Sequence, residues 1–181
     1  KGGLPDSPGY EVECEIARGA MGRVLAARDL ALDRDVAIKL TLGDGAETKR
    51  RFLRESRIAA RLPHPCIPPV HALGILPDGT DYLAMKLVRG KTLAELLRAH
   101  REAANGEPAA NRFLGEFESI CQAIAFAHRE NVIHRDLKPA NVMVGAFGEV
   151  QVMDWGLARS GAAKPGSPDD SVASGAQGAI E

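Results

Sequence analysis

The stretch His134-Arg135-Asp136-Leu137-Lys138-Pro139-Ala140-Asn141 is followed, after a short interval, by Asp154-Trp155-Gly156. The two segments supply two carboxylates, an amide and an ammonium group. Oxygen ligands of this kind suit a hard cation such as Mg²⁺, and an ammonium group suits a phosphate. The two segments therefore predict a site where a phosphoryl group moves from a Mg-nucleotide to a hydroxyl.

The composition is that of an ordinary globular domain. The chain has 181 residues with a formal net charge of −1, which argues against a nucleic-acid or anionic-membrane binder driven by bulk charge. Its cysteines, Cys14, Cys66 and Cys121, form no C-x-x-C pair, which favours a reducing compartment and argues against a disulfide framework or zinc site. No apolar run of about 18 residues predicts a membrane-spanning segment. Because the chain begins with Lys1, we expect it to be a piece of a longer polypeptide.

The first half of the chain predicts an antiparallel sheet with one helix. Alternating apolar and polar residues predict strands at 10–18, 22–29, 35–42, 70–76 and 82–88. The segment Glu47–Leu62, stopped by Pro63 and Pro65, predicts the helix. Residues 1–9 are rich in Gly and Pro and predict a flexible lead-in.

The second half changes to a helical period. A short helix is predicted over Thr92–His100, with Thr92 as a possible N-cap, and a loop over 103–110. Apolar residues at three- and four-residue spacing predict a long amphipathic helix over 111–129. A small hairpin is predicted at 142–144 and 150–153. Residues 159–181 are rich in Ser, Gly and Ala, and predict a flexible tail.

In this order, the elements and motifs resemble a bacterial eukaryotic-like (Hanks-type) serine/threonine protein kinase over about residues 10–160. The resemblance implies an α+β, two-lobe fold with a small lobe at 10–88. It also implies a partial large lobe with the catalytic loop at 89–158, and an activation-segment tail at 159–181. The implied cofactors are ATP and Mg²⁺.

The resemblance implies an ATP site between the two lobes. The segment Ile16–Val24 is similar to the glycine loop over the phosphates, with Ala17 in place of the family's first glycine. Lys39 is implied to contact the phosphates and to pair with Glu55. The hinge at Lys86–Val88 is implied to bond adenine, behind the gatekeeper Met85. The full implied nucleotide set is Ile16, Gly19, Gly22, Val24, Ala37, Lys39, Met85, Lys86, Val88 and Met143.

The resemblance also assigns the catalytic groups. Asp136 is implied to be the base for the substrate hydroxyl, and Lys138 to neutralise charge on the moving phosphoryl group. Asn141 and Asp154 are implied to hold Mg²⁺. A lysine two residues after Asp136 is typical of the serine/threonine version of this loop. Trp155 replaces the family's phenylalanine, and its indole N–H needs a partner.

Two further residues near Asp136 have different expected roles. His134 is interpreted as a packing and backbone-anchoring residue, because Asp136 already fills the role of base. Arg135 suggests control by loop phosphorylation, since an arginine in this place clamps a phosphate. The candidate acceptors are Ser160, Ser167, Ser171 and Ser174, whose alternative reading is a solvated linker.

Three functions stay open at this point. The first is a protein kinase with a Ser/Thr substrate, in the cytoplasm, in a parent protein that carries a membrane anchor in some bacterial relatives. Autophosphorylation and kinase dimers are compatible with it. The second is a non-catalytic pseudokinase, against which stand Lys39, Glu55, Asp136, Asn141 and Asp154. The third is a kinase for a small-molecule alcohol or aminoglycoside.

The family's later Pro-Glu motif and helices are missing from these residues. We therefore expect the peptide platform to be absent, the helix around Phe117–His128 to expose an apolar face, and the chain alone to be a poor enzyme.

Overall fold

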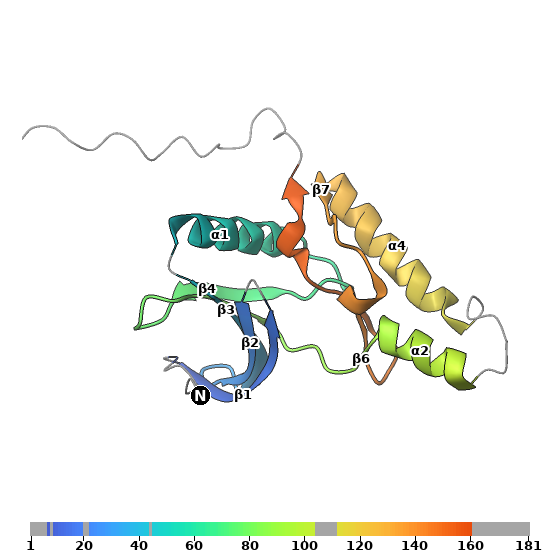
Figure 1. Cartoon of the computed structure of the whole chain (residues 1–181), viewed down its shortest axis with the longest axis horizontal. Helices are drawn as coiled ribbons and strands as arrows, with labels where there is room; N and C mark the ends of the chain where they lie inside the picture. Colours follow the sequence, from blue (N-terminus) through green and yellow to red (C-terminus); the bar gives the residue numbers. More distant parts are fainter. Residues whose placement is uncertain (1–6, 8, 20–21, 44, 104–111, 161–181) are drawn as a thin grey trace, which may run out of the picture.

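The computed structural model describes residues 7, 9–19, 22–43, 45–103 and 112–160. Figure 1 shows a sheet with helix α1 against it, connected to a second part that carries two helices and short strands. The expected α+β organisation, an antiparallel sheet with one helix and a second part with further helices, is confirmed. Ala20, Met21, residues 104–110 of the predicted loop, and Ser167, Ser171 and Ser174 lie outside the described residues.

The sheet is antiparallel, with strand order β1-β2-β3-β5-β4. Its strands match the predicted positions to within a few residues: β1 Tyr10–Gly19, β2 Gly22–Asp29, β3 Arg34–Thr41, β4 Val70–Ile75 and β5 Asp81–Lys86. At the end of the predicted lead-in, Ser7 is buried and its carbonyl accepts the Tyr10 N–H at 2.9 Å.

The two faces of this sheet carry different sets of residues, because successive side chains of a strand point to opposite sides. One face carries Leu25 and Ala27 of β2 together with Val36, Ile38 and Leu40 of β3, all buried in one apolar cluster. The other face carries the residues between them, Val24, Ala26, Ala37 and Lys39. The sequence alternation that predicts the strands thus also divides core residues from residues facing the second part of the molecule.

Helix α1, Ala46–Ala60, connects the sheet to the second part. Its buried positions are Phe52, Ser56 and Ile58. Phe52 and Ser56 lie one turn apart and share a face, whereas Ile58 follows only two residues later and faces another side of the helix. Ile58 and the following Leu62 belong to the larger apolar cluster, which also contains Trp155. The C-terminal end of α1 is therefore anchored outside the sheet.

The second part begins with β6, Lys91–Thr92, and α2, Leu93–Ala103. Thr92 is confirmed as a capping residue, because its hydroxyl accepts the Glu95 N–H at 3.2 Å while the Glu95 carboxylate accepts the Thr92 N–H at 2.7 Å. The remaining elements are α4 Leu114–Arg129, β7 Val132–Ile133, η1 Pro139–Asn141, β8 Val142–Val144, β9 Val150–Val152, η2 Trp155–Leu157 and β10 Arg159–Ser160.

Two observations bear on the ends of this part. The tail predicted to be flexible from residue 159 instead begins with β10, which pairs with β7. The pairing gives the backbone groups of β10 hydrogen-bond partners on β7, which the composition of the tail could not predict.

The exposed apolar face expected on the long helix is present, since Leu114 and Phe117 of α4 are both more than 60% exposed. Within the described residues, no helix has the length and apolarity needed to cross a membrane.

Gly90 lies in the segment that connects the sheet to the second part, just before β6. Its φ is +149°, and a Cβ there would lie 2.2 Å from the Val144 carbonyl oxygen and 2.9 Å from Gly145 Cα. We predict that Gly90→Ala lowers the free energy of unfolding by about 2–4 kcal/mol, because rigid backbone must move. Gly79→Ala is the control, since Gly79 also has positive φ but an open neighbourhood, and its cost should be about 1 kcal/mol. Urea denaturation followed by circular dichroism measures both, and equal losses would contradict the steric explanation.

Candidate active site

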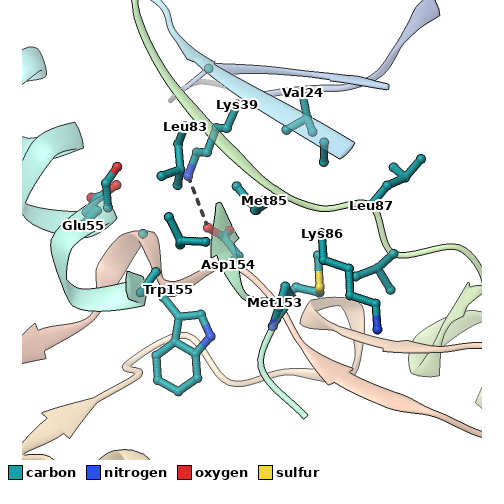
Figure 2. A pocket seen from close by; sticks show the side chains of 18 of the residues that line it. Val24, Lys39, Glu55, Leu83, Met85, Lys86, Leu87, Met153, Asp154 and Trp155 are labelled. Atoms are coloured by element: carbon teal, nitrogen blue, oxygen red, sulfur yellow. Dashed lines mark ion pairs between the residues drawn. The ribbon is translucent and has the colours of Figure 1, made fainter. Parts of the chain in front are cut away.

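A cavity of about 510 Å³ lies between the sheet, α1 and the segment around Asp154. Figure 2 shows Val24, Lys39, Leu83 and Met85 on its sheet side and Glu55 on α1. Leu87 and its neighbours Lys86 and Val88 line one end. The volume is in the range of pockets that bind small ligands and cofactors, and the wall is mainly apolar, as is common for such pockets.

Strand register brings the apolar wall together. Val24 of β2 lies opposite Lys39 of β3, and Ala37 of β3 lies opposite Met85 of β5. Leu83 of β5 is opposite Lys39. Side chains opposite one another across antiparallel strands share a face, so these residues form one continuous surface. Ala37, with its small side chain, leaves room on this surface for a ligand.

The two glycines of the β1–β2 hairpin have different surroundings. A Cβ on Gly22 would lie 2.2 Å from the Leu40 carbonyl oxygen, so β3 itself requires a glycine there. A Cβ on Gly19 would meet nothing within 4 Å. A side chain at Gly19 would therefore meet open space, while Gly22 permits close strand packing. On the hairpin, Arg18 and Arg23 both bond the Glu15 carboxylate and lower its pKa to about 2.

Lys39 is directed into the cavity and toward Asp154. Its side chain is 20% exposed, and Nζ lies 3.9 Å from Asp154 Oδ1, the ion pair drawn in Figure 2. The partner implied for Lys39 was Glu55, and the structure differs on this point. Glu55 Oε1 accepts a hydrogen bond from Arg51 Nε at 2.8 Å. Arg51 stands one helical turn before Glu55, where a local pair forms without any movement of the sheet.

The catalytic-loop side chains form their own cluster. Lys138 Nζ lies 2.8 Å from Asp136 Oδ2, and Asn141 Nδ2 donates to the same oxygen at 3.0 Å. The hydrogen bond from Lys138 is the largest cause of a lowered Asp136 pKa, with Asn141 acting in the same direction. Asp136 is therefore an anion at neutral pH.

The two motifs meet at the backbone of Met153. Its N–H donates to the Asn141 carbonyl at 2.7 Å, and its carbonyl bonds His134 Nε2 at 2.9 Å. Because His134 Nδ1 accepts the Asp136 N–H at 3.3 Å, the Nε2 atom carries the proton and donates. This agrees with the anchoring role expected for His134. Arg135 Nε donates to the Leu157 carbonyl at 2.6 Å, a third bond between the motifs.

Trp155 is 6% exposed and belongs to the larger apolar cluster. Its ring lies 4.6 Å from the His134 ring, measured between centroids, and it points away from Lys39 in Figure 2. The indole N–H finds the partner it needs in the Val152 carbonyl, at 3.1 Å. The preceding Asp154 has φ +55°, so the chain turns sharply between the buried ring and the carboxylate.

The donor set fits a hard cation with water or phosphate oxygens completing its shell. Asp154 presents a half-exposed carboxylate, and Asn141 uses its amide nitrogen toward Asp136, so its amide oxygen could serve as a ligand. Among the described residues, no group of three or more His, Cys, Asp or Glu side chains could hold a metal by itself. An Mg²⁺ ion shared with a nucleotide needs fewer protein ligands than that.

Most residues of the implied nucleotide set line the cavity: Ile16, Gly19, Gly22, Val24, Ala37, Lys39, Met85, Lys86 and Val88. Met143 is the exception. It lies on β8, opposite Thr92 and Gln151, and is not among the residues that line the cavity, whereas Met153 is. Sequence reasoning also missed Leu83 and Arg51. The β3–β5 register places Leu83, and the i,i+4 spacing to Glu55 could have indicated Arg51.

Comparison of the sequence with known proteins shows which family it resembles. The sequence profile of the protein kinase domain matches residues 10–174. The chain is 39% identical over 170 residues to the serine/threonine-protein kinase PknD of Protochlamydia amoebophila, which covers 87% of this chain and 17% of that protein. It is 41% identical over 159 residues to the PknD of Chlamydia muridarum, covering 82% of this chain and 17% of the relative. The chain thus spans about a sixth of the length of these relatives.

The indole bond of Trp155 can be tested by a single substitution. We predict that Trp155→Phe lowers the free energy of unfolding by about 1–3 kcal/mol, because it removes the donor to Val152 and leaves unfilled volume in the core. Circular dichroism is the measurement, since Trp155 is the single tryptophan of the chain and fluorescence is lost with it. A variant as stable as the parent would show that the indole bond adds nothing.

The Lys138–Asp136 contact makes a prediction about pH. Because Lys138 holds the pKa of Asp136 below its usual range, Lys138→Met should raise that pKa. Protonation of Asp136 would then begin at a higher pH, which carbon NMR of the labelled carboxyl group can follow. Lys91→Met removes an exposed lysine of β6 and serves as the control. An unchanged Asp136 titration in Lys138→Met would refute the assignment.

Proposed function

Since this chain belongs to the protein kinase domain family, we propose that it is the catalytic part of an ATP-dependent serine/threonine protein kinase. The reaction transfers the γ-phosphoryl group of Mg-ATP to a Ser or Thr hydroxyl of a protein. The observation that supports this most directly is the Lys39–Asp154 contact across the cavity, next to the anionic Asp136 loop.

We assign the nucleotide to the described cavity. Adenine would lie against Val24, Ala37 and Met85, with its polar edge at the Lys86–Val88 hinge. The phosphates would extend toward Lys39, beneath the hairpin that carries Gly19. Asn141 and Asp154 would supply the protein oxygens for Mg²⁺, which neutralises phosphate charge when bound.

The loop residues would then act on the acceptor. Asp136, already an anion at neutral pH, would orient the hydroxyl and accept its proton, while Lys138 would stabilise charge that develops on the transferring phosphoryl group. Lys138 and the relatives named as serine/threonine-protein kinases support a Ser/Thr acceptor. We place the reaction in the cytoplasm, and include autophosphorylation among its outcomes.

The test uses the full-length protein that contains this chain, labelled Mg-ATP and a general protein acceptor. We predict that Asp136→Asn lowers transfer by at least about 10²-fold, because acid–base and orienting effects of a positioned side chain are of this size. Mg-ADP binding should persist in that variant, because Asp136 lies outside the cavity wall. Lys39→Met should weaken binding and transfer together.

Asp78→Asn is the control for Asp136→Asn, since it makes the same chemical change in the β4–β5 turn, where Asp78 bonds the Thr80 N–H. Transfer should be unaffected by it. Transfer that survives Asp136→Asn would contradict the assigned base. Tight nucleotide binding without transfer by the parent protein would contradict the enzyme and indicate a pseudokinase. Transfer only to small alcohols would contradict the protein acceptor.

A further inference from the structure

The Glu55 carboxylate lies within reach of two sites. It lines the nucleotide cavity together with Lys39, and it also lines a second hollow together with Glu47 and Arg51. Its side chain is only 12% exposed, so a charged partner matters to it. In this structure the partner is Arg51, at 2.8 Å, while Lys39 is paired with Asp154 at 3.9 Å.

Lys39 and Arg51 differ in how strongly each requires an acidic partner. Lys39 is fixed on a sheet strand within a mainly apolar wall, where an unpaired ammonium group is costly. Arg51 is 47% exposed on the surface of α1. It has a second acidic neighbour at helical spacing, Glu47, which now bonds Arg50 at 3.2 Å. Arg51 can therefore leave Glu55 at small cost, by a side-chain rotation within one hollow.

The acidic partners of Lys39 are few. Of the described residues that line the nucleotide cavity, only Glu55 and Asp154 are acidic. The proposed function requires the Asp154 carboxylate for the cation, which leaves Glu55 as the anion that can hold Lys39 in place against the phosphates. A Glu55 carboxylate occupied by Arg51 is less available for this task.

We propose that Arg51 is a positioning residue that competes with Lys39 for Glu55, and thereby lowers the fraction of molecules whose Lys39 is ready for nucleotide. The proposal rests on the proposed function for the identity of the ligand. The proposal and a general charge effect predict opposite changes in the affinity for an anionic ligand when Arg51 is removed. Removing a cation near a phosphate site should weaken binding of an anion, whereas removing a competitor should strengthen it.

The experiment measures Mg-ADP affinity by calorimetry in the full-length protein. Arg51→Gln should bind Mg-ADP about two- to fivefold more tightly, the range expected from losing one partly exposed ion pair. Arg57→Gln is the matched control: it removes the same charge from an exposed position of the same helix, outside both hollows. Its affinity should be unchanged or slightly weaker. The gain from Arg51→Gln should disappear when Lys39→Met or Glu55→Gln is also present, since the competition then lacks a member.

Three results would overturn the proposal: unchanged or weaker binding by Arg51→Gln, an equal gain in Arg57→Gln, or a gain that persists beside Lys39→Met. Transfer is measured separately on the same proteins. If the parent binds Mg-ADP and shows the expected cycle but transfers no phosphate, the proposed function fails and the competition stands. If the parent binds no Mg-ADP at all, both fail.

Discussion

The fold of this site depends on the backbone of Met153, which is bonded from both sides by the loop of residues 134–141. Asn141 accepts its N–H and His134 bonds its carbonyl. These two bonds hold the catalytic loop, which carries Asp136, next to the segment that carries Asp154. Backbone groups buried without partners are expensive, so these two bonds satisfy a local requirement while they position the carboxylates.

A second constraint couples this junction to helix α1. Trp155 follows Asp154 directly and is packed in the same apolar cluster as Ile58 and Leu62, at the C-terminal end of the helix. Glu55 stands one turn earlier on the same helix and faces Gly156, whose added Cβ would lie 3.3 Å from Glu55 Oε2. The position of Glu55 therefore depends on the packing of the Trp155 segment. The proposed exchange of Glu55 between Arg51 and Lys39 would take place next to this segment.

Several elements could be predicted from local pattern because the physics is local. Alternation at 22–29 and 35–42 predicts both the strands and which of their residues share a face. The Thr92–Glu95 box fixes the start of α2. The spacing from Asp136 to Asn141 allows the amide to bond the same carboxylate that Lys138 holds. For the Thr92–Glu95 box and the Asp136 loop, the interacting groups belong to residues within five positions of each other in the sequence.

Other features needed distant parts of the chain. The pairing of β7 with β10 joins residues far apart in sequence, and nothing in the composition after residue 159 indicates it. The resemblance implied Met143 as a cavity residue, but β8 pairs Met143 with Thr92 and Gln151, and Met153 lines the cavity instead. Local sequence pattern is enough to predict the charged groups of this protein and the strands and helices that carry them. The pairing of acids with cations could not be predicted in the same way, because Lys39, Glu55 and Asp154 come from three separate elements and ion pairing depends on the distances between them in the folded chain.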